Sequence, residues 1–266
     1  MKAKGGLKIF FQVLSFALFI VGVFGLISAT DARSTGKVGK VIVDINPLEN
    51  EVFLIKNEDL ARLLKKSYKL KLKDQFVDKL DLTRIESIIE KNDFVADAQV
   101  YIDARNNLKI NVVQKTPIMR VILKDNSTFF IDQTGKKLPV SKNAILRLPV
   151  LTGELPLFKN EMIKDNKNVY AKSFNIMKAI LEDPFMNALT EQLVVDEKKD
   201  VSIIPKLGNH KIIMGDAEDI ENKFKRLEIF YKQGMPPEGW NIYKEINLKY
   251  KDQVVAKKIE GEPIKS

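Results

Sequence analysis

The chain has 266 residues, no cysteine, one histidine and a formal net charge of +9 at pH 7. The lack of cysteine excludes a disulfide framework, a thiolate metal site and a thiol nucleophile. A serine triad or a histidine-based metal site could be built only around His210, which we expect in a turn or at the surface. Carboxylates are plentiful, but none stands in a catalytic motif, and no glycine loop suits a phosphate. The residues therefore give little support for catalysis, although counting carboxylates does not exclude a paired-acid mechanism, and we expect no cofactor or metal.

The N-terminal region contains one long apolar run at residues 9–29. At about 1.5 Å per residue it is long enough to cross the ~30 Å hydrocarbon core once. A cleaved signal peptide is the alternative, but such peptides have shorter apolar cores of about 7 to 15 residues. We expect an anchor in the cytoplasmic (inner) membrane, with residues 1–8 as a cytoplasmic tail and the bulk exported. Export favours anionic lipid or cell-wall polymer over nucleic acid as a partner for the basic charge.

A polar linker is expected at residues 30–39, followed by a small domain at residues 40–115. Its pattern predicts a strand at 40–45, a helix at 58–66 and a second helix opened by a capping box from Thr83 to Glu86. Two alternating strands follow at 95–102 and 108–113, joined by a turn. The order strand, helix, helix, strand, strand indicates an α+β fold.

A basic run extends from Lys65 to Lys73. Lysines near an anionic surface each contribute on the order of 1 kcal/mol, so this run could contact lipid headgroups or wall polymer. A solvated helix end and loop is the simpler interpretation, and we favour it.

Residues 116–258 have a β-rich pattern that predicts a second α+β domain with a mostly antiparallel sheet and two helices, before a tail at 259–266. One helix is expected at 170–182, ended by Asp183-Pro184, and one from an N-cap at Asp216 to Gly234. Strands are expected at 121–123, 128–131, 137–139, 192–195, 201–204 and 211–214, with a closing hairpin of 242–248 and 253–257.

Several motifs, in this order and spacing, resemble the FtsQ/DivIB family of bacterial cell-division proteins. Each is weak alone, but together with the N-terminal run they cover nearly the whole chain. They lie at residues 82–100, 108–113, 116–120, 130–135, 148–153, 246–250 and 253–255.

The resemblance implies an anchor, a POTRA domain and then a β domain. It also implies a non-enzymatic scaffold at the division septum, which gathers FtsB-like and FtsL-like single-pass partners. In such proteins the partner is held at the last strands of the β domain. An exposed edge strand has unpaired N–H and C=O groups, so an extended peptide can add to it as a further strand.

By this resemblance Tyr250 is the aromatic anchor, Lys249 contacts an acidic partner residue, and the backbone of Gln253–Ala256 forms the pairing edge. Lysine replaces the usual arginine at 249 and loses its bidentate fork, and Gln114 stands where the family commonly has glutamate. The full set of expected partner-binding residues is Leu248, Lys249, Tyr250, Gln253, Val254, Val255 and Ala256.

Two alternatives stay open from the sequence. Tyr250 could pack on Trp240 or on a neighbouring helix rather than contact a partner. The whole chain could instead be a membrane-anchored exported enzyme or a cell-wall sensor whose carboxylates or basic face act on a ligand.

Overall fold

The computed structural model describes residues 36–68, 72–73, 75–235 and 239–259. The predicted span at 9–29, the tail before it and the C-terminal residues beyond 259 lie outside these ranges. Within them, no helix combines the length and the apolar character that a membrane crossing needs. The chain divides into two compact units, unit 1 up to Gln114 and unit 2 from Lys115, and each is described by itself.

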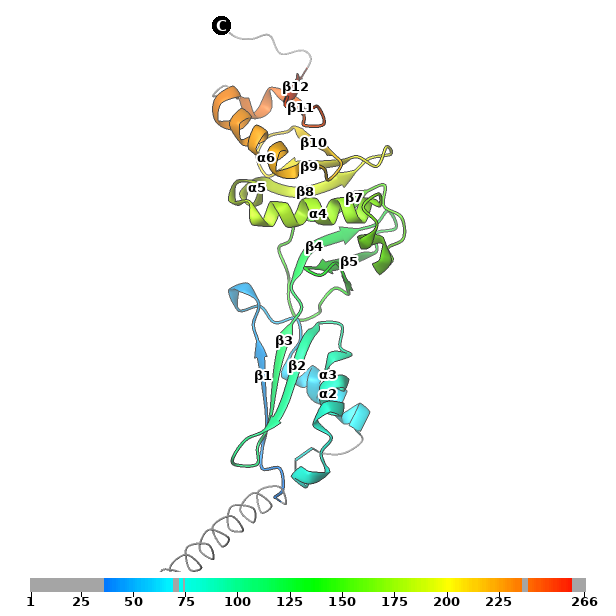
Figure 1. Ribbon diagram of the computed structural model, residues 1–266, viewed down its shortest axis with the longest axis vertical. Helices are drawn as coiled ribbons and strands as arrows, with labels where there is room; N and C mark the ends of the chain where they lie inside the picture. The colour runs from blue at the N-terminus through cyan, green and yellow to red at the C-terminus, as the bar shows by residue number, and fades with distance from the viewer. Residues whose placement is uncertain (1–35, 69–71, 74, 236–238, 260–266) are drawn as a thin grey trace, which may run out of the picture. The chain divides into compact units, whose positions relative to one another are not determined.

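Unit 1 has a sheet with two helices on one of its faces (Figure 1). Its central strand β3 pairs in parallel with β1 and antiparallel with β2. The elements are β1 Val41–Asn46, η1 Glu49–Glu51, α2 Asn57–Tyr68, η2 Val77–Lys79, α3 Leu82–Glu90, β2 Val95–Ile102 and β3 Leu108–Gln114. The predicted order is confirmed, with two short 3-10 turns added.

The core of unit 1 follows from the helical spacing of three isoleucines on α3. Ile85, Ile88 and Ile89 are all buried and belong to one apolar cluster with Ile110 and Val112 of the central strand. Burial of each such side chain contributes about 1.5–3 kcal/mol relative to exposure. The amphipathic pattern of α3 thus holds this helix on the sheet.

The start of α3 differs from the predicted capping box. Asp81 is the N-cap, and its carboxylate accepts a hydrogen bond from the Arg84 N–H at 2.9 Å. Glu86 does not serve a cap at Thr83, because its Oε1 accepts from the Val100 N–H at 2.8 Å. The predicted box is wrong, and Glu86 instead connects the helix to β2.

Gln114 ends unit 1 with a buried amide. Its Oε1 accepts from the N–H groups of Leu54 (2.6 Å) and Ile55 (3.3 Å), and its Nε2 donates to the Asn46 carbonyl at 2.8 Å. A glutamate could accept the first two bonds but could not donate the third while ionised. Glutamine therefore satisfies both kinds of backbone group without burying a charge.

Among the described residues, unit 2 contains a nine-stranded sheet in the order β12-β11-β10-β9-β8-β7-β4-β5-β6. The pairs β4–β7, β7–β8 and β10–β11 are parallel and the other neighbours antiparallel, so the mostly antiparallel prediction is confirmed. Of these strands, β7 is the one that the pattern did not predict. The strands are β4 Pro117–Ile122, β5 Thr128–Asp132, β6 Lys137–Leu138, β7 Val150–Gly153, β8 Thr190–Val195, β9 Val201–Pro205, β10 Lys211–Gly215, β11 Tyr243–Asn247 and β12 Val255–Lys258.

Both predicted helices of unit 2 are present, and a short helix is added between them. Asp183 ends α4 as expected, and its carboxylate then accepts from the Met186 N–H at 2.9 Å to begin α5. The helical elements are η3 Asn160–Lys164, α4 Val169–Glu182, α5 Pro184–Leu189, α6 Ile220–Ile229, the π turn η4 Phe230–Gly234 and η5 Gly239–Asn241.

The predicted N-cap of α6 is wrong. The helix begins at Ile220, after Asp219 in a left-handed backbone conformation with φ of 50°. Asp216 instead forms an ion pair with Lys223, 2.7 Å from Oδ1 to Nζ. A lysine that is nearly fully buried needs this partner, because an isolated buried charge is costly.

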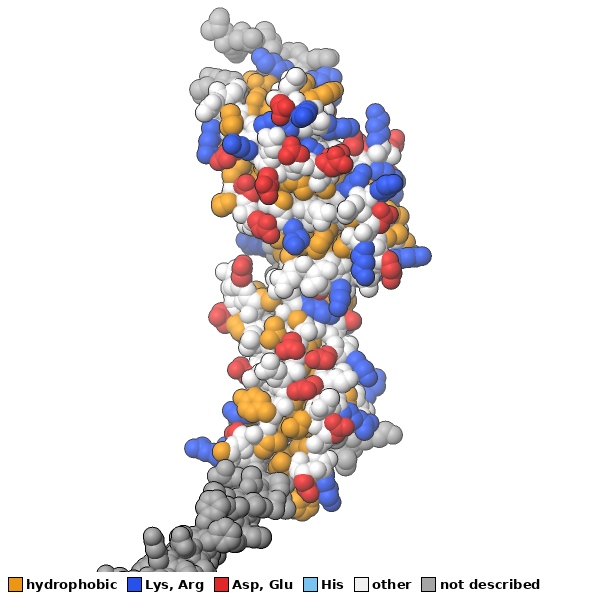
Figure 2. Space-filling model, in the orientation of Figure 1, with side chains coloured by type: hydrophobic (Ala, Val, Ile, Leu, Met, Phe, Trp, Pro, Cys, Tyr) orange, Lys and Arg blue, Asp and Glu red, His pale blue; other side chains and the backbone are white. Residues whose placement is uncertain are grey.

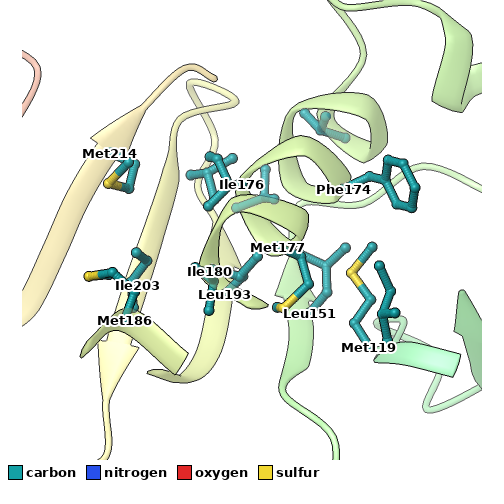
Figure 3. Packing of buried hydrophobic residues seen from close by; sticks show 14 of the residues in the cluster. Met119, Leu151, Phe174, Ile176, Met177, Ile180, Met186, Leu193, Ile203 and Met214 are labelled. Carbon is teal, nitrogen blue, oxygen red and sulfur yellow. The ribbon is translucent and has the colours of Figure 1, made fainter. Parts of the chain in front are cut away.

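The core of unit 2 lies between α4 and the sheet. Met177 and Ile180 of α4 lie close to Leu151 and Leu193 of neighbouring strands (Figure 3), and all four are fully buried. Leu181, the next residue of α4, is 38% exposed. The buried stripe of α4 therefore passes through Ile180 rather than Leu181.

Candidate functional site

The predicted site residues lie on and beside the C-terminal hairpin of β11 and β12 (Figure 1). Among the described strands, β12 is paired on one side only, with β11. Just past its end, the Ile259 N–H donates to the Ile242 carbonyl at 2.9 Å. Because backbone groups alternate in direction along an antiparallel strand, we expect those of Ala256 and Lys258 to face away from β11. They would form the free edge of the sheet.

The loop between β11 and β12 is held from α6 by Arg226. One guanidinium nitrogen, Nη1, donates to the Tyr250 carbonyl at 2.8 Å and also to the Gln253 carbonyl, and Nη2 donates to the Leu248 carbonyl at 3.4 Å. Leu248 itself is fully buried, so its side chain fixes the hairpin to the core. No sequence pattern pointed to Arg226, which contacts residues 22 to 27 positions later in the chain.

Tyr250 presents its side chain to solvent, with 55% of the residue exposed. Trp240, the packing partner that the sequence left open, instead lies against Tyr231 with 5.2 Å between ring centroids. A half-exposed tyrosine offers an apolar ring and a polar tip, the combination enriched at protein interfaces. The geometry leaves Tyr250 accessible to a partner.

Lys249 already has a partner within unit 2. Its Nζ lies 2.5 Å from Oδ2 of Asp200, in the turn between β8 and β9. This hydrogen bond is the main reason that the pKa of Lys249 is raised above its ordinary value. Its aliphatic stem lies over Gly215, where φ is +75° and an added Cβ would come 2.8 Å from the Lys249 Cγ. An acidic partner residue would therefore have to compete with Asp200.

The remaining site residues alternate between core and solvent. Val254 and Ala256 are half-buried and pack against the main core cluster of unit 2. Gln253 and Val255 are exposed, Val255 by 44%. The strand therefore combines an unpaired edge with one exposed β-branched side chain.

His210 is buried, so the predicted turn or surface role is wrong. Only 2% of the residue is exposed, and its ring nitrogens face the Tyr231 hydroxyl and, at 3.4 Å, the Trp240 carbonyl. Burial lowers the pKa of His210, because the charged imidazolium loses its hydration. The residue joins β10 to the π turn and to the segment before β11, within a cluster of aromatic rings.

The charged side chains suggest neither a metal site nor a nucleic-acid surface. Within the described ranges, no group of three or more histidine, aspartate or glutamate side chains is placed to hold a metal ion. Basic and acidic side chains are interspersed over the visible face of each unit (Figure 2).

Comparison with protein families matches both units. The family model described as FtsQ/DivIB, C-terminal related, matches residues 116–257, more than half of the chain. A POTRA-like domain model matches residues 38–113. A search of the curated proteins finds no match. The described α+β units fit these models, and the chain belongs to the FtsQ/DivIB family of cell-division proteins, which are generally non-enzymatic.

Proposed function

We propose that this chain is a bitopic membrane scaffold of the septum-forming machinery. Residues 1–8 would lie in the cytoplasm, 9–29 would span the inner membrane and 30–39 would link the span to the exported part. A POTRA-like domain at 40–115, a β domain at 116–258 and a tail at 259–266 complete this division. The uninterrupted apolar run and the membership of a division family support it.

The proposed partners are FtsB-like and FtsL-like single-pass proteins, one of which adds a strand to β12. The observation that carries this proposal is the outer edge of β12, with which no described strand pairs, beside the exposed ring of Tyr250. Strand addition supplies backbone hydrogen bonds as the source of affinity, and alternating side chains supply specificity. A partner strand paired along Ala256 and Lys258 would satisfy the backbone groups that we expect to face outward.

Four of the predicted site residues receive roles consistent with their positions. Tyr250 and Val255 offer exposed side chains for contact, whereas Leu248 is buried and positions the loop. Lys249 would exchange its bond with Asp200 for a partner carboxylate. Arg226, which holds three carbonyls of the loop, is a further positioning residue.

The side-chain test replaces Tyr250 with glutamate. We expect Tyr250→Glu in the full chain to lose at least tenfold of its capture of the FtsB-like protein from detergent-solubilised membranes, because a charge replaces an exposed aromatic contact. The matched control is Tyr101→Glu, at a tyrosine of unit 1 with a similar exposed fraction of 46%. Equal capture by both folded variants would contradict the site.

The backbone test is Ala256→Pro against Ala256→Ser. Proline removes an N–H that we expect to face the free edge, and edge strands tolerate proline in that orientation. Ala256→Pro should therefore weaken capture more than Ala256→Ser at similar thermal stability. In cells, depletion of the chain should produce undivided filaments, whereas normal division with altered wall chemistry would favour the enzyme or sensor alternative.

A further inference from the structure

One end of unit 1 exposes an aromatic ring between two lysines. Phe76 is 41% exposed, and the Nζ atoms of Lys37 and Lys79 each lie 5.3 Å from its ring centroid. A cation within about 6 Å of a ring centroid is attracted to the face of the ring, so Phe76 keeps two cations close to each other. We call the surface of Lys37, Lys40, Phe76, Lys79 and Arg105 the basal face.

The backbone holds Phe76 in this exposed position. The Val38 N–H donates to the Gln75 carbonyl at 2.8 Å, and the Val77 N–H donates to the Gly36 carbonyl at 2.9 Å. Val38 is buried in the core, and Val77 packs against it. Phe76 is therefore directed outward from a segment whose neighbours on both sides are fixed.

The basal face also includes the turn between β2 and β3, which lies at the same end of the sheet as the start of β1 (Figure 1). The Gly39 N–H donates to the Asn106 carbonyl at 3.0 Å, which brings the exposed side chains of Lys40 and Arg105 to this end. Among the described residues near Phe76 and in this turn, the acidic groups are Asp78 and Asp81, both exposed, and Asp103. Asp103 is occupied by hydrogen bonds within the turn. Basic groups therefore predominate.

The sequence limits how far this face can lie from a membrane. Seven residues separate Ala29, the end of the apolar run, from Lys37. At no more than about 3.6 Å per residue, Lys37 lies within roughly 29 Å of the end of the run. The face is thus at the end of unit 1 where the chain enters from the proposed span.

We propose that the basal face docks on the anionic headgroups of the membrane, with the Phe76 ring in the interfacial layer. Lysine and arginine near an anionic leaflet are attracted to it, and amphipathic or aromatic side chains favour the interface. The membrane interface takes up both parts of this face, the cations at the headgroups and the apolar ring at the boundary with the acyl chains, and the chain enters this end of unit 1 from the proposed span, so the lipid surface is the occupant. This inference rests on the proposed anchor, and it concerns residues other than the basic run at 65–73.

The test uses the absence of native cysteine, which allows a single spin label in the full chain. The label is placed at Asp78→Cys, beside Phe76, or at Glu49→Cys, an exposed position after the far end of β1. The chain is reconstituted into phosphatidylcholine vesicles with or without phosphatidylglycerol. We expect the ratio of oxygen to aqueous nickel accessibility at position 78 to rise several-fold with phosphatidylglycerol, and that at position 49 to stay unchanged.

Two further variants separate the contribution of the lysine charges from that of the Phe76 ring. Lys37→Glu with Lys79→Glu should abolish the rise, whereas the control pair Lys56→Glu with Lys91→Glu, with the same charge change on exposed lysines elsewhere on unit 1, should keep it. Phe76→Ser should reduce the rise in the accessibility ratio at position 78. If the chain inserts into the vesicles but the label at position 78 stays accessible to water, the docking inference is overturned and the proposed anchor is not. A chain that does not insert at all would overturn the anchor of the proposed function as well.

Discussion

The two edge strands of the unit 2 sheet are protected very differently. β6 has two residues, its Lys137 N–H donates to Asn160 Oδ1 at 3.3 Å, and its Leu138 is fully buried. β12 has four residues and carries Val255 with 44% of its surface exposed. Within the described residues, the same sheet thus has one edge covered by its own chain and one edge left open.

Natural sheets usually blunt their edges with short strands, lysines or covering segments, because an open edge invites pairing with another chain. β6 shows these devices together, since Lys137 also places its Nζ 4.5 Å from the Phe129 ring centroid. The fold is therefore compatible with a protected edge. β12 is also short and carries Lys257 and Lys258, but no described strand pairs with its outer side, so within the described residues its openness is a local property of the C-terminal hairpin.

The largest predicted difference between the edges is in their contribution to stability. Leu138→Ala should lower the free energy of unfolding by about 2–5 kcal/mol, because it leaves a cavity in the core. Val255→Ala, at a half-exposed side chain, should cost less than about 1 kcal/mol. Urea unfolding of the full chain in detergent measures both. A larger loss for Val255→Ala would mean that β12 is not an open edge.

The next effect concerns the loop that supports the open edge. Arg226→Ala removes the donor to the carbonyls of Leu248, Tyr250 and Gln253, so it should cost about 1–3 kcal/mol and speed amide exchange in residues 248–255. Exchange at β6 should not change. Arg226→Lys should recover only part of the effect, because it lacks the planar fork. Uniform exchange changes at both edges would refute a local role.

The smallest predicted effect is pH-dependent. The bond to Asp200 raises the folded-state pKa of Lys249 above 10.5, so its stabilisation is fully present below that pH and is lost as the pH rises through the folded value. Since 45% of the Lys249 side chain is exposed, solvent screening limits the effect to below about 1 kcal/mol. The free energy of unfolding, measured at neutral and at strongly alkaline pH, should fall less between the two for Lys249→Met than for the unchanged chain.

Elements with strong periodicity were predictable from the sequence. The alternating strands at 95–102 and 108–113 are confirmed, because one buried face imposes its period on the residues. The N-caps of α3 and α6 were not predictable. Several acidic residues near the start of each helix could act as the N-cap, and contacts with distant residues determine which one does. Glu86 bonds to Val100, and Asp216 to Lys223.

The candidate site divides in the same way. The closing hairpin follows from local pattern, but the contacts of Arg226, Lys249 and His210 join positions 21 to 49 residues apart. His210 was misjudged because its flanking residues, Asn209 and Lys211, are polar. A single sequence carries no signal for the aromatic cluster that surrounds it.

The parallel pairing of β1 with β3 has a mechanical consequence. The chain enters unit 1 at the start of β1, near Val41, and leaves it at the end of β3, at Gln114. Tension between these two points pulls β1 and β3 in opposite directions along their length. The hydrogen bonds between them, over the register from Val41↔Leu108 to Asn46↔Val113, are therefore sheared together rather than opened one by one. Unit 1 is thus arranged to transmit a pulling force between its two ends without unravelling.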